Sequence, residues 1–320
     1  MASKLNRKGR RKLETPKRQY ALRESALYAL RGKNQLLRVL LWTGTFDELE
    51  TLSQSDCNYK CWVENNRPVQ EARPRIRVLQ ARIATLLRRI APPDYRHSGV
   101  RKRSFLSNAQ IHLHDQPMLQ FDLRKFYPST TFKHVFNFFR FQLTCAADLA
   151  DLLARICCFE GNHLPTGGVH SEVLAFYCHK TAFDAIDSRA KERGGRMSTY
   201  VDDVGITAPE ISLTDLEWIR ALMAKRGLTL HPGKSFVTRK LDARTITGVW
   251  ISRGRAYAPP EQQLKIRALN GELIGAPSIK TARYAACRLM GHYDHVAQIE
   301  RRYRTVALGN RARLMSLLKL

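Results

Sequence analysis

Acidic residues are scarce in this sequence relative to basic ones. Its 320 residues include 28 Asp and Glu against 54 Lys and Arg, which leaves a formal net charge of +26. So large an excess of positive charge would repel itself without a polyanion nearby, and this makes nucleic acid the natural partner. An acidic protein or an anionic membrane surface would also satisfy the charge.

Long hydrophobic runs are absent as well. No uninterrupted apolar stretch approaches the roughly 20 residues that a bilayer span requires. The first 20 residues are rich in Lys and Arg and lack the apolar segment of a secretory signal. We therefore expect a basic tail over residues 1–20 and a cytoplasmic protein.

Cysteines and histidines with metal-ligand spacing are also lacking. The seven cysteines are an odd number, and neither Cys57/Cys61 nor the adjacent Cys157/Cys158 supplies two metal-spaced couples. The ten histidines are scattered singly. We therefore expect reduced structural thiols in place of a disulfide framework or a zinc site.

Hydrophobic periodicity predicts a mixture of helices and strands. Helical spacing covers residues 21–41 (as two short helices), 75–90, 132–143, 146–158, 172–191, 213–226 and most of 260–320. Alternation predicts a hairpin over 59–69 and strands over 117–123, 196–201, 204–207 and 245–251. The order of these elements indicates an α+β fold, with helices on one face of a sheet.

Three carboxylates stand out in this pattern. Asp122 ends one predicted strand, and Asp202 and Asp203 lie at the tip of a tight predicted hairpin. An Asp pair in a turn is common by itself, but three converging carboxylates repel one another unless cations neutralise them. Two magnesium ions about 4 Å apart ionise an attacking hydroxyl and stabilise a pyrophosphate leaving group. Such a group of carboxylates is suited to binding magnesium, and the sequence around it decides the reading.

Short motifs around these carboxylates resemble those of reverse transcriptases. Tyr-Val-Asp-Asp at residues 200–203 and Phe-Asp-Leu at 121–123 are similar to the catalytic motifs of that family. Asn-Ala-Gln-Ile-His at 108–112 resembles the Asn-Ala-x-x-His signature of bacterial retron reverse transcriptases, and Ile-Thr-Gly at 246–248 resembles their Val-Thr-Gly signature. The similarity runs in order from about residue 22 to residue 291.

The resemblance implies an α+β right-hand polymerase whose antiparallel palm sheet packs on helices. The N-terminal helices and fingers would occupy residues 21–106, after the tail. The palm, with some fingers elements, would occupy 107–252, and a basic helical thumb 253–320.

The resemblance also assigns residues to an incoming nucleotide, beside metal ligation by the three aspartates. Lys60 and Arg67 would grip the triphosphate, although a merely solvated hairpin is the alternative. Tyr127, five residues after Asp122 and next to Phe126, would crowd the sugar 2′ position and reject ribonucleotides; a core aromatic is the alternative.

Two further positions complete the expected nucleotide site. Gly167, followed by Gly168, would let the backbone approach the template–nucleotide pair closely. Lys234 resembles the family's later lysine, a proton donor to pyrophosphate. Departures from the family pattern include Thr166 in place of Gln and Glu172 in place of Pro, and they concern the positioning of the template.

RNA would be held by the two signatures and the basic C-terminal helices. The residues expected to contact it are Asn108, His112, Thr247, Gly248, Arg301, Arg302, Arg304, Arg311 and Arg313.

The function implied by the resemblance is RNA-directed DNA synthesis with two Mg²⁺ ions and dNTP substrates. The enzyme would copy part of its cognate structured noncoding RNA from an internal guanosine 2′-hydroxyl and form a branched RNA–DNA product, msDNA. Its setting would be the bacterial cytoplasm and antiphage defence, with an effector or toxin encoded nearby. We expect no ribonuclease H domain, so that host ribonuclease H would trim the template. The alternatives are another bacterial reverse transcriptase, of intron or phage-defence type, and a non-catalytic RNA-binding scaffold.

Overall fold

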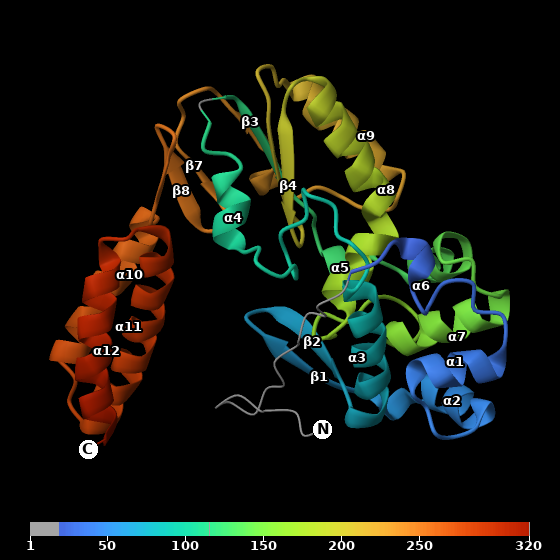
Figure 1. The fold of residues 1–320 in the computed structure, drawn as a ribbon. Helices are drawn as coiled ribbons and strands as arrows, with labels where there is room; N and C mark the ends of the chain where they lie inside the picture. The colour runs from blue at the N-terminus through green and yellow to red at the C-terminus, as the bar shows by residue number, and fades with distance from the viewer. Residues whose placement is uncertain (1–18, 115, 320) are drawn as a thin grey trace.

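The N-terminal half combines short helices with one projecting hairpin (Figure 1). The structure, a computed structural model, describes residues 19–114 and 116–319, and the side chains of these except 313, 314 and 316–319. Most of the predicted basic tail therefore lies outside the described residues. The first elements are η1 (Leu22–Glu24), α1 (Lys33–Leu40), α2 (Phe46–Ser53), η2 (Asp56–Asn58), β1 (Tyr59–Glu64), β2 (Arg67–Ala72) and α3 (Pro74–Arg88).

Local sequence explains two of these elements. Thr45 caps α2, because its side chain accepts the N–H of Glu48 while the Glu48 carboxylate accepts the N–H of Thr45. Asn65 and Asn66 connect β1 to β2 with φ angles of 50° and 58°, a left-handed conformation that Asn tolerates and that tight hairpin turns need. The predicted hairpin is confirmed.

An antiparallel four-stranded sheet in the order β4-β5-β3-β6 forms the centre of the fold. Its strands are β3 (Met118–Asp122), β4 (Arg196–Tyr200), β5 (Asp203–Thr207) and β6 (Phe236–Thr238). The α+β class is confirmed, but both faces of the sheet are covered. On one face, Leu119 and Ile206 line a pocket together with residues of α8 (Ser171–Glu192) and α9 (Leu213–Ala224). On the other face, Met118 packs with α4 (Phe105–Gln110) and the second sheet.

The remaining central helices bury the largest apolar cluster. They are α5 (Phe126–Ser129), α6 (Phe132–Asn137), a π-helical turn (Phe138–Gln142) and α7 (Ala147–Cys157). Together with α1, α3 and α8 they enclose residues such as Leu36, Ile83, Phe139 and Phe183, none of which has exposed surface. This cluster holds the central sheet in a rigid frame.

The C-terminal region begins with a three-stranded sheet of β7 (Arg244–Ile246), β8 (Val249–Ser252) and β9 (Arg255–Tyr257). The single strand predicted for residues 245–251 is therefore wrong, because the chain reverses at Thr247 and Gly248, whose φ angles are 46° and 77°. Such a pair of positive φ angles closes a two-residue hairpin.

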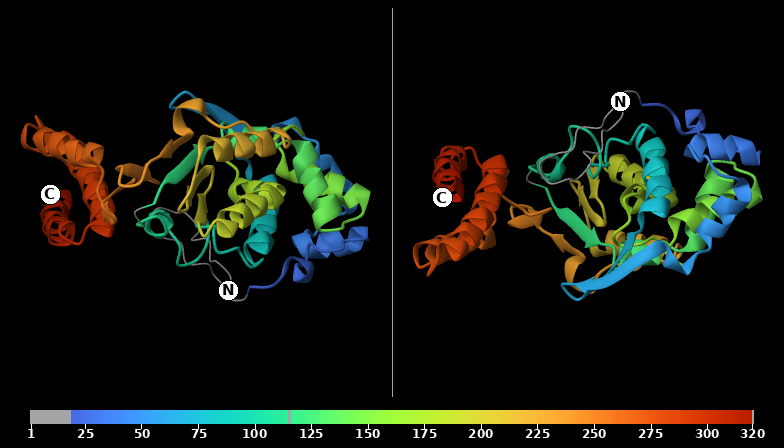
Figure 2. Two further views of the ribbon diagram at one scale, coloured as in Figure 1. Left: turned by 90° about the horizontal axis from the view of Figure 1, so that it is seen from above. Right: turned by 90° about the horizontal axis from the view of Figure 1, so that it is seen from below.

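A helical bundle ends the chain and lies to one side of the central body (Figures 1 and 2), which it contacts where His295 stacks on Phe105 of α4. Its helices are α10 (Pro260–Ile274), α11 (Ile279–Ile299) and α12 (Tyr303–Lys319). Ile266, Leu269, Leu289 and Val296 form a core separate from that of the body. No helix among the described residues is long and apolar enough to cross a membrane.

Candidate active site

The three predicted carboxylates meet at one end of the central sheet. β3 and β5 pair so that Asp122 lies opposite Asp203, and the N–H of Leu123 donates to the carbonyl of Asp202 at 3.0 Å. The β4–β5 connection consists of Val201 and Asp202, and Val201 has a φ of 61°. A β-branched residue rarely adopts this conformation, so the surrounding contacts must hold the turn in place.

These carboxylates are poorly compensated by positive charge. Burial, and then the charge of Asp122, raise the pKa of Asp203 to about 6 and raise the pKa of Asp202. The Nζ of Lys234 lies 2.9 Å from Oδ2 of Asp122. The charges of Lys234 and Arg67 lower the pKa of Asp202, but burial and the charge of Asp122 outweigh them. The excess of buried negative charge favours binding of a divalent cation.

The carboxylates suit a magnesium site whose remaining ligands come from water and substrate, not from the protein. Among the described residues, no three His, Cys, Asp or Glu side chains converge tightly enough to enclose a metal ion by themselves. Magnesium keeps several waters and takes further oxygens from substrate phosphates, so a few carboxylates at an open edge suit it. Metal binding by Asp122, Asp202 and Asp203 stays a prediction.

The β1–β2 hairpin presents its cations on one face. Lys60, Trp62 and Glu64 alternate onto the same side of β1, and Arg67 pairs with Glu64 across the hairpin. Because the charge of Arg67 lowers the pKa of Asp202, this face is within electrostatic reach of the carboxylates. Lys60 lies 5.9 Å from the ring centre of Trp62. Sequence reasoning missed the exposed Trp62, and its alternation with Lys60 and Glu64 along β1 was the available signal.

The two adjacent aromatics of α5 take different places. Phe126 is only 4% exposed and packs with His179 and Phe183, so its assignment to the nucleotide is corrected to a core role. Tyr127 is partly buried, and burial, then the charges of Glu172 and Asp202, raise its pKa. Tyr127 therefore lies near the carboxylates, as a nucleotide-facing side chain would.

The two signature motifs pack against each other on one face of the central sheet. Asn108 and His112 are 1% and 0% exposed, and the ring of His112 hydrogen-bonds to Ser198 of β4 and Thr207 of β5 at 2.7 Å and 3.1 Å. Direct RNA contact by either side chain does not fit this burial, so the prediction for them is corrected to a positioning role. Helix packing on a sheet, which decides burial here, is not visible in local sequence.

The second signature forms the β7–β8 turn. The backbone of Thr247 lowers the pKa of the Asp203 carboxyl, against the effect of burial, and the Thr247 hydroxyl donates to the carbonyl of Phe105 at 2.9 Å. Gly248 is exposed at the tip of the turn. RNA contact by Thr247 and Gly248 stays a prediction, but the bond of Thr247 to Phe105 was not foreseen.

Comparison with known proteins adds an independent observation. No protein-family model matches this chain. The retron Ec86 reverse transcriptase of Escherichia coli is 25% identical over 245 residues, which cover 75% of this chain and 74% of that protein. The retron Se72 reverse transcriptase of Salmonella heidelberg is 22% identical over 215 residues, 64% of this chain and 56% of that protein.

The chain is related to the retron reverse transcriptases. This confirms the resemblance that the short motifs indicated. The first of these alignments extends well beyond the motifs themselves and covers three quarters of the chain.

One residue that departs from the reverse-transcriptase pattern lies in a buried ion pair. Glu172 accepts hydrogen bonds from Arg96 at 2.9 Å and from Ser98 at 2.8 Å, and Arg96, 2% exposed, stacks 4.3 Å from the ring centre of Phe176. Burial alone would raise the pKa of Glu172, but the Arg96 charge and these hydrogen bonds outweigh it and lower it. The pair fixes the start of α8 behind Tyr127.

The glycine expected to contact the nucleotide also contacts β2. The N–H of Gly167 donates to the carbonyl of Gln70 at 3.2 Å, and a Cβ at this position would lie 2.7 Å from that carbonyl oxygen. Thr166 donates to the carbonyl of Pro68 at 2.6 Å. The absence of a side chain at Gly167 therefore lets the hairpin dock onto the body, a role that was not predicted, and contact of Gly167 with the nucleotide stays a prediction.

Among the exposed arginines of the C-terminal bundle, two form ion pairs with carboxylates of the bundle. Arg302 pairs with Glu300 and Arg311 with Asp294, both at 2.7 Å. Arg301 and Arg304 are exposed and make no ion pair with any described residue. The side chain of Arg313 lies outside the described residues. RNA binding by this group stays a prediction.

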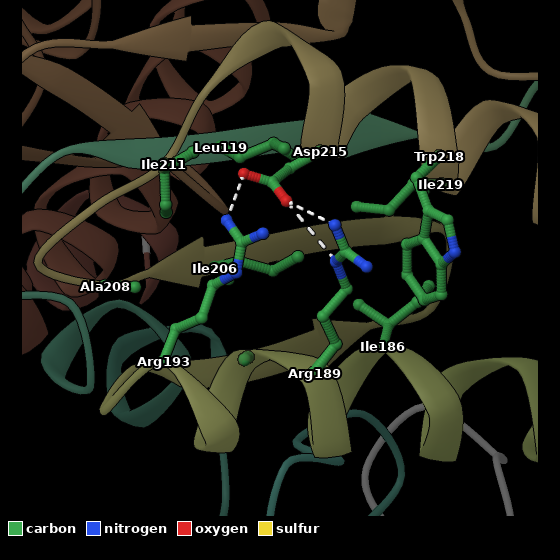
Figure 3. A pocket seen from close by; sticks show the side chains of 11 residues that line it. Leu119, Ile186, Arg189, Arg193, Ile206, Ala208, Ile211, Asp215, Trp218 and Ile219 are labelled. Carbon is green, nitrogen blue, oxygen red and sulfur yellow. Dashed lines mark hydrogen bonds and ion pairs between the residues drawn. The ribbon is translucent and has the colours of Figure 1, made fainter.

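A pocket on the opposite face of the central sheet is structural in character. In Figure 3, Asp215 at the start of α9 lies between Arg189 of α8 and Arg193, the residue that follows α8. The ion-pair distances are 3.0 Å and 2.6 Å, and Arg189 stacks 4.5 Å from the ring centre of Trp218. These ion pairs connect α9 to the C-terminal end of α8, and both oxygens of the Asp215 carboxylate are bound by arginines.

Proposed function

We propose that this chain is an RNA-directed DNA polymerase of the retron kind. The observation that carries the proposal is the pairing of Asp122 with Asp203 beside Asp202, in a chain related to retron reverse transcriptases. We assign β3–β6 to a palm, the β1–β2 hairpin to fingers and α10–α12 to a thumb.

Each side chain at the site has a distinct part in the proposed reaction. Bound magnesium would supply Lewis-acid activation of the attacking hydroxyl and of the leaving pyrophosphate. Asp122, Asp202 and Asp203 supply hard oxygen ligands. Lys60 and Arg67 neutralise the triphosphate.

Two further residues would select the nucleotide and assist the departure of pyrophosphate. Tyr127 is partly buried. Its ring borders the space for the nucleotide sugar and excludes a 2′-hydroxyl by steric contact. Lys234 bonds to Asp122 at 2.9 Å and has a proton to give to the departing pyrophosphate once that carboxylate binds a metal.

We extend the proposal to the substrate through the relation to retron enzymes. The template would be a cognate structured noncoding RNA, primed by an internal guanosine 2′-hydroxyl, and the product a branched RNA–DNA molecule. The net charge of +26 supports a polyanionic partner of this kind. A role in antiphage defence, a nearby effector and trimming by host ribonuclease H rest on the family relation alone.

Primer extension tests the proposal. Purified protein with magnesium, dNTPs and its adjacent noncoding RNA should give labelled DNA, and Asp202→Asn should abolish synthesis while RNA binding persists. Asp148→Asn, an exposed carboxylate at the start of α7, is the matched control and should retain activity.

Other outcomes select the alternatives. RNA binding by the wild type without any DNA product would favour a non-catalytic scaffold. Extension of an added DNA primer, with no branched product from the noncoding RNA, would favour another branch of reverse transcriptases.

A further inference from the structure

The β1–β2 hairpin has an exposed tip and a docked base. Every residue from Lys60 to Pro68 is exposed, whereas Gln70 and Ala72 are only 7% and 6% exposed. A two-stranded hairpin is at best marginally stable in water by itself. The direction in which the tip points is therefore decided where the base meets the rest of the protein.

One contact holds the start of β1. The ring of Tyr59 meets that of Phe159 edge-on, with centres 5.1 Å apart. The Tyr59 hydroxyl donates to the carbonyl of Cys158 at 3.3 Å and accepts from the side-chain amide of Gln80 of α3 at 2.8 Å. These bonds fix one point of the hairpin, and a second point is needed to fix its direction.

A second contact holds β2 and centres on Gln70. The backbone N–H of Thr166 donates to Oε1 of Gln70 at 3.0 Å, and the Thr166 hydroxyl lies 2.9 Å from the same oxygen. That hydroxyl donates to the carbonyl of Pro68 at 2.6 Å, and the N–H of Gly167 donates to the carbonyl of Gln70 at 3.2 Å. Because a backbone N–H can only donate, it fixes which end of the amide faces Thr166.

The two contacts lie on one face of the hairpin and the predicted triphosphate ligands on the other. Gln70 pairs with Cys61, two residues along β1 from Tyr59, so Gln70 and Tyr59 share a face. Lys60 and Arg67 belong to the opposite face. The docking of the first face therefore determines where these two cations are held.

The loop that receives Gln70 is connected to the segment that carries Tyr127. Leu164, which has no exposed surface, donates its N–H to the carbonyl of Thr130 at 3.0 Å. Thr130 directly follows α5, the short helix of Tyr127. Thr166 therefore offers the hairpin a docking point whose place relative to Tyr127 is set by buried contacts.

We propose that Gln70 is a positioning residue for the incoming nucleotide. By holding β2 on the loop at Thr166, it sets the place of Lys60 and Arg67 relative to Tyr127. Without the bonds to Thr166 the hairpin keeps its other anchor, but its tip moves and the two cations are spread over many positions. This inference rests on the proposed polymerase function and adds to it a residue that supports the cationic pair from the far side of the hairpin.

The first experiment replaces the amide with an apolar side chain of similar length. Gln70→Met should raise the KM for dNTPs in primer extension about tenfold, because hydrogen bonds that hold a binding group are lost, with kcat and RNA affinity unchanged within about twofold. Gln70→Glu keeps an oxygen for the Thr166 N–H and should recover most of the KM. A Gln70→Glu protein as impaired as Gln70→Met would refute the role of this oxygen. Gln54→Met, an exposed glutamine at the end of α2, is the matched control and should match wild type.

A double-mutant cycle tests the pairing with the loop. Thr166→Val removes the hydroxyl and should raise the KM for dNTPs by a smaller factor, whereas Thr166→Ser should leave it near wild type. Gln70→Met and Thr166→Val together should raise the KM by less than the product of their separate factors, because both changes release the same contact. Factors that simply multiply would contradict a shared docking contact.

Amide exchange in the full-length protein separates this inference from the proposed function. In Gln70→Met the N–H of Thr166 should exchange faster than in wild type and in Gln54→Met. If the wild type makes no DNA, the polymerase proposal fails, yet faster exchange at Thr166 still supports the docking role. Unchanged exchange at Thr166, or a KM for dNTPs that stays at the wild-type value, would overturn the positioning role. A loss of RNA affinity as large as the rise in KM would assign Gln70 to stability alone and would also count against it.

Discussion

Acid should unfold this protein at a pH where most of its carboxylates are still ionised. His112, His170 and His179 each have 0% of their surface exposed, and burial lowers their pKa to about 3, about 4 and about 3. His170 donates from Nε2 to the carbonyl of Cys157 at 2.7 Å, while its Nδ1 has no described partner. A second proton would place an unpaired donor and a charge in the core.

The size of the effect follows from proton linkage. The unfolded histidines titrate near pH 6.5 and the folded ones well below it, so their stabilisation is complete above about pH 6.5 and declines as the pH falls. At pH 5 each of the three has lost about 2 kcal/mol, roughly 6 kcal/mol together. Asp203, whose pKa is about 6, opposes this by about 1 kcal/mol, because its folded form takes up a proton first. A net loss near 5 kcal/mol is comparable with the whole stability of many domains.

Urea unfolding at pH 7.5 and pH 5.0 measures this loss directly. His112→Gln should reduce the pH-dependent loss by about 2 kcal/mol while lowering stability at pH 7.5. His114→Gln, two residues away and exposed, should leave the pH dependence as in wild type. A wild-type stability that is equal at both pH values, or a His112→Gln protein with an unchanged pH dependence, would refute the assignment of these buried histidines.

Three further predictions concern single features of the site. Tyr127→Ala should raise incorporation of ribonucleotides relative to dNTPs at least about tenfold, measured by competing the two in primer extension; unchanged selectivity would return Tyr127 to the core. Arg96→Met should destabilise the protein by about 3–5 kcal/mol in urea, because it leaves Glu172 buried and unpaired, and a loss below about 1 kcal/mol would contradict the buried pair. Neutralising Arg301 and Arg304 together should reduce the slope of log affinity for RNA against log salt by about 1.5, whereas an unchanged slope would exclude these arginines from the RNA contact.

The sequence predicts those parts of the fold that local patterns specify. The hairpin around Asn65 and Asn66 and the carboxylate hairpin around Asp202 both combine alternating strands with a short turn, and period-two alternation fixes the face of each side chain. Asp122 follows the same rule at the end of β3. Local patterns therefore placed Asp122 at a strand end and Asp202 and Asp203 in a turn, whereas their convergence depends on the pairing of β3 with β5.

The rest depends on contacts between segments far apart in the chain. Nothing local distinguishes the buried His112, bonded to β4 and β5, from a surface histidine. The stretch around Thr247 alternates like one strand, and only the positive φ values at Thr247 and Gly248 reveal the turn. Gly167 has a recognisable need for space, but its neighbour, the carbonyl of Gln70, comes from another part of the chain.

Comparison of two aspartates separates a candidate reactive carboxylate on the central sheet from a structural one on α9. Burial alone would raise the pKa of Asp215, but hydrogen bonds from the Ser212 backbone and from Arg189, together with the charge of Arg193, outweigh it and lower the pKa. At Asp203 burial is reinforced by the charge of Asp122, and the pKa rises to about 6 although the charge of Lys234 opposes the rise. The carboxylate of Asp215 has its partners within the protein and stabilises the α8–α9 contact. The carboxylate of Asp203 is only partly compensated by the described residues, as expected for a metal ligand, and metal binding by Asp203 stays a prediction.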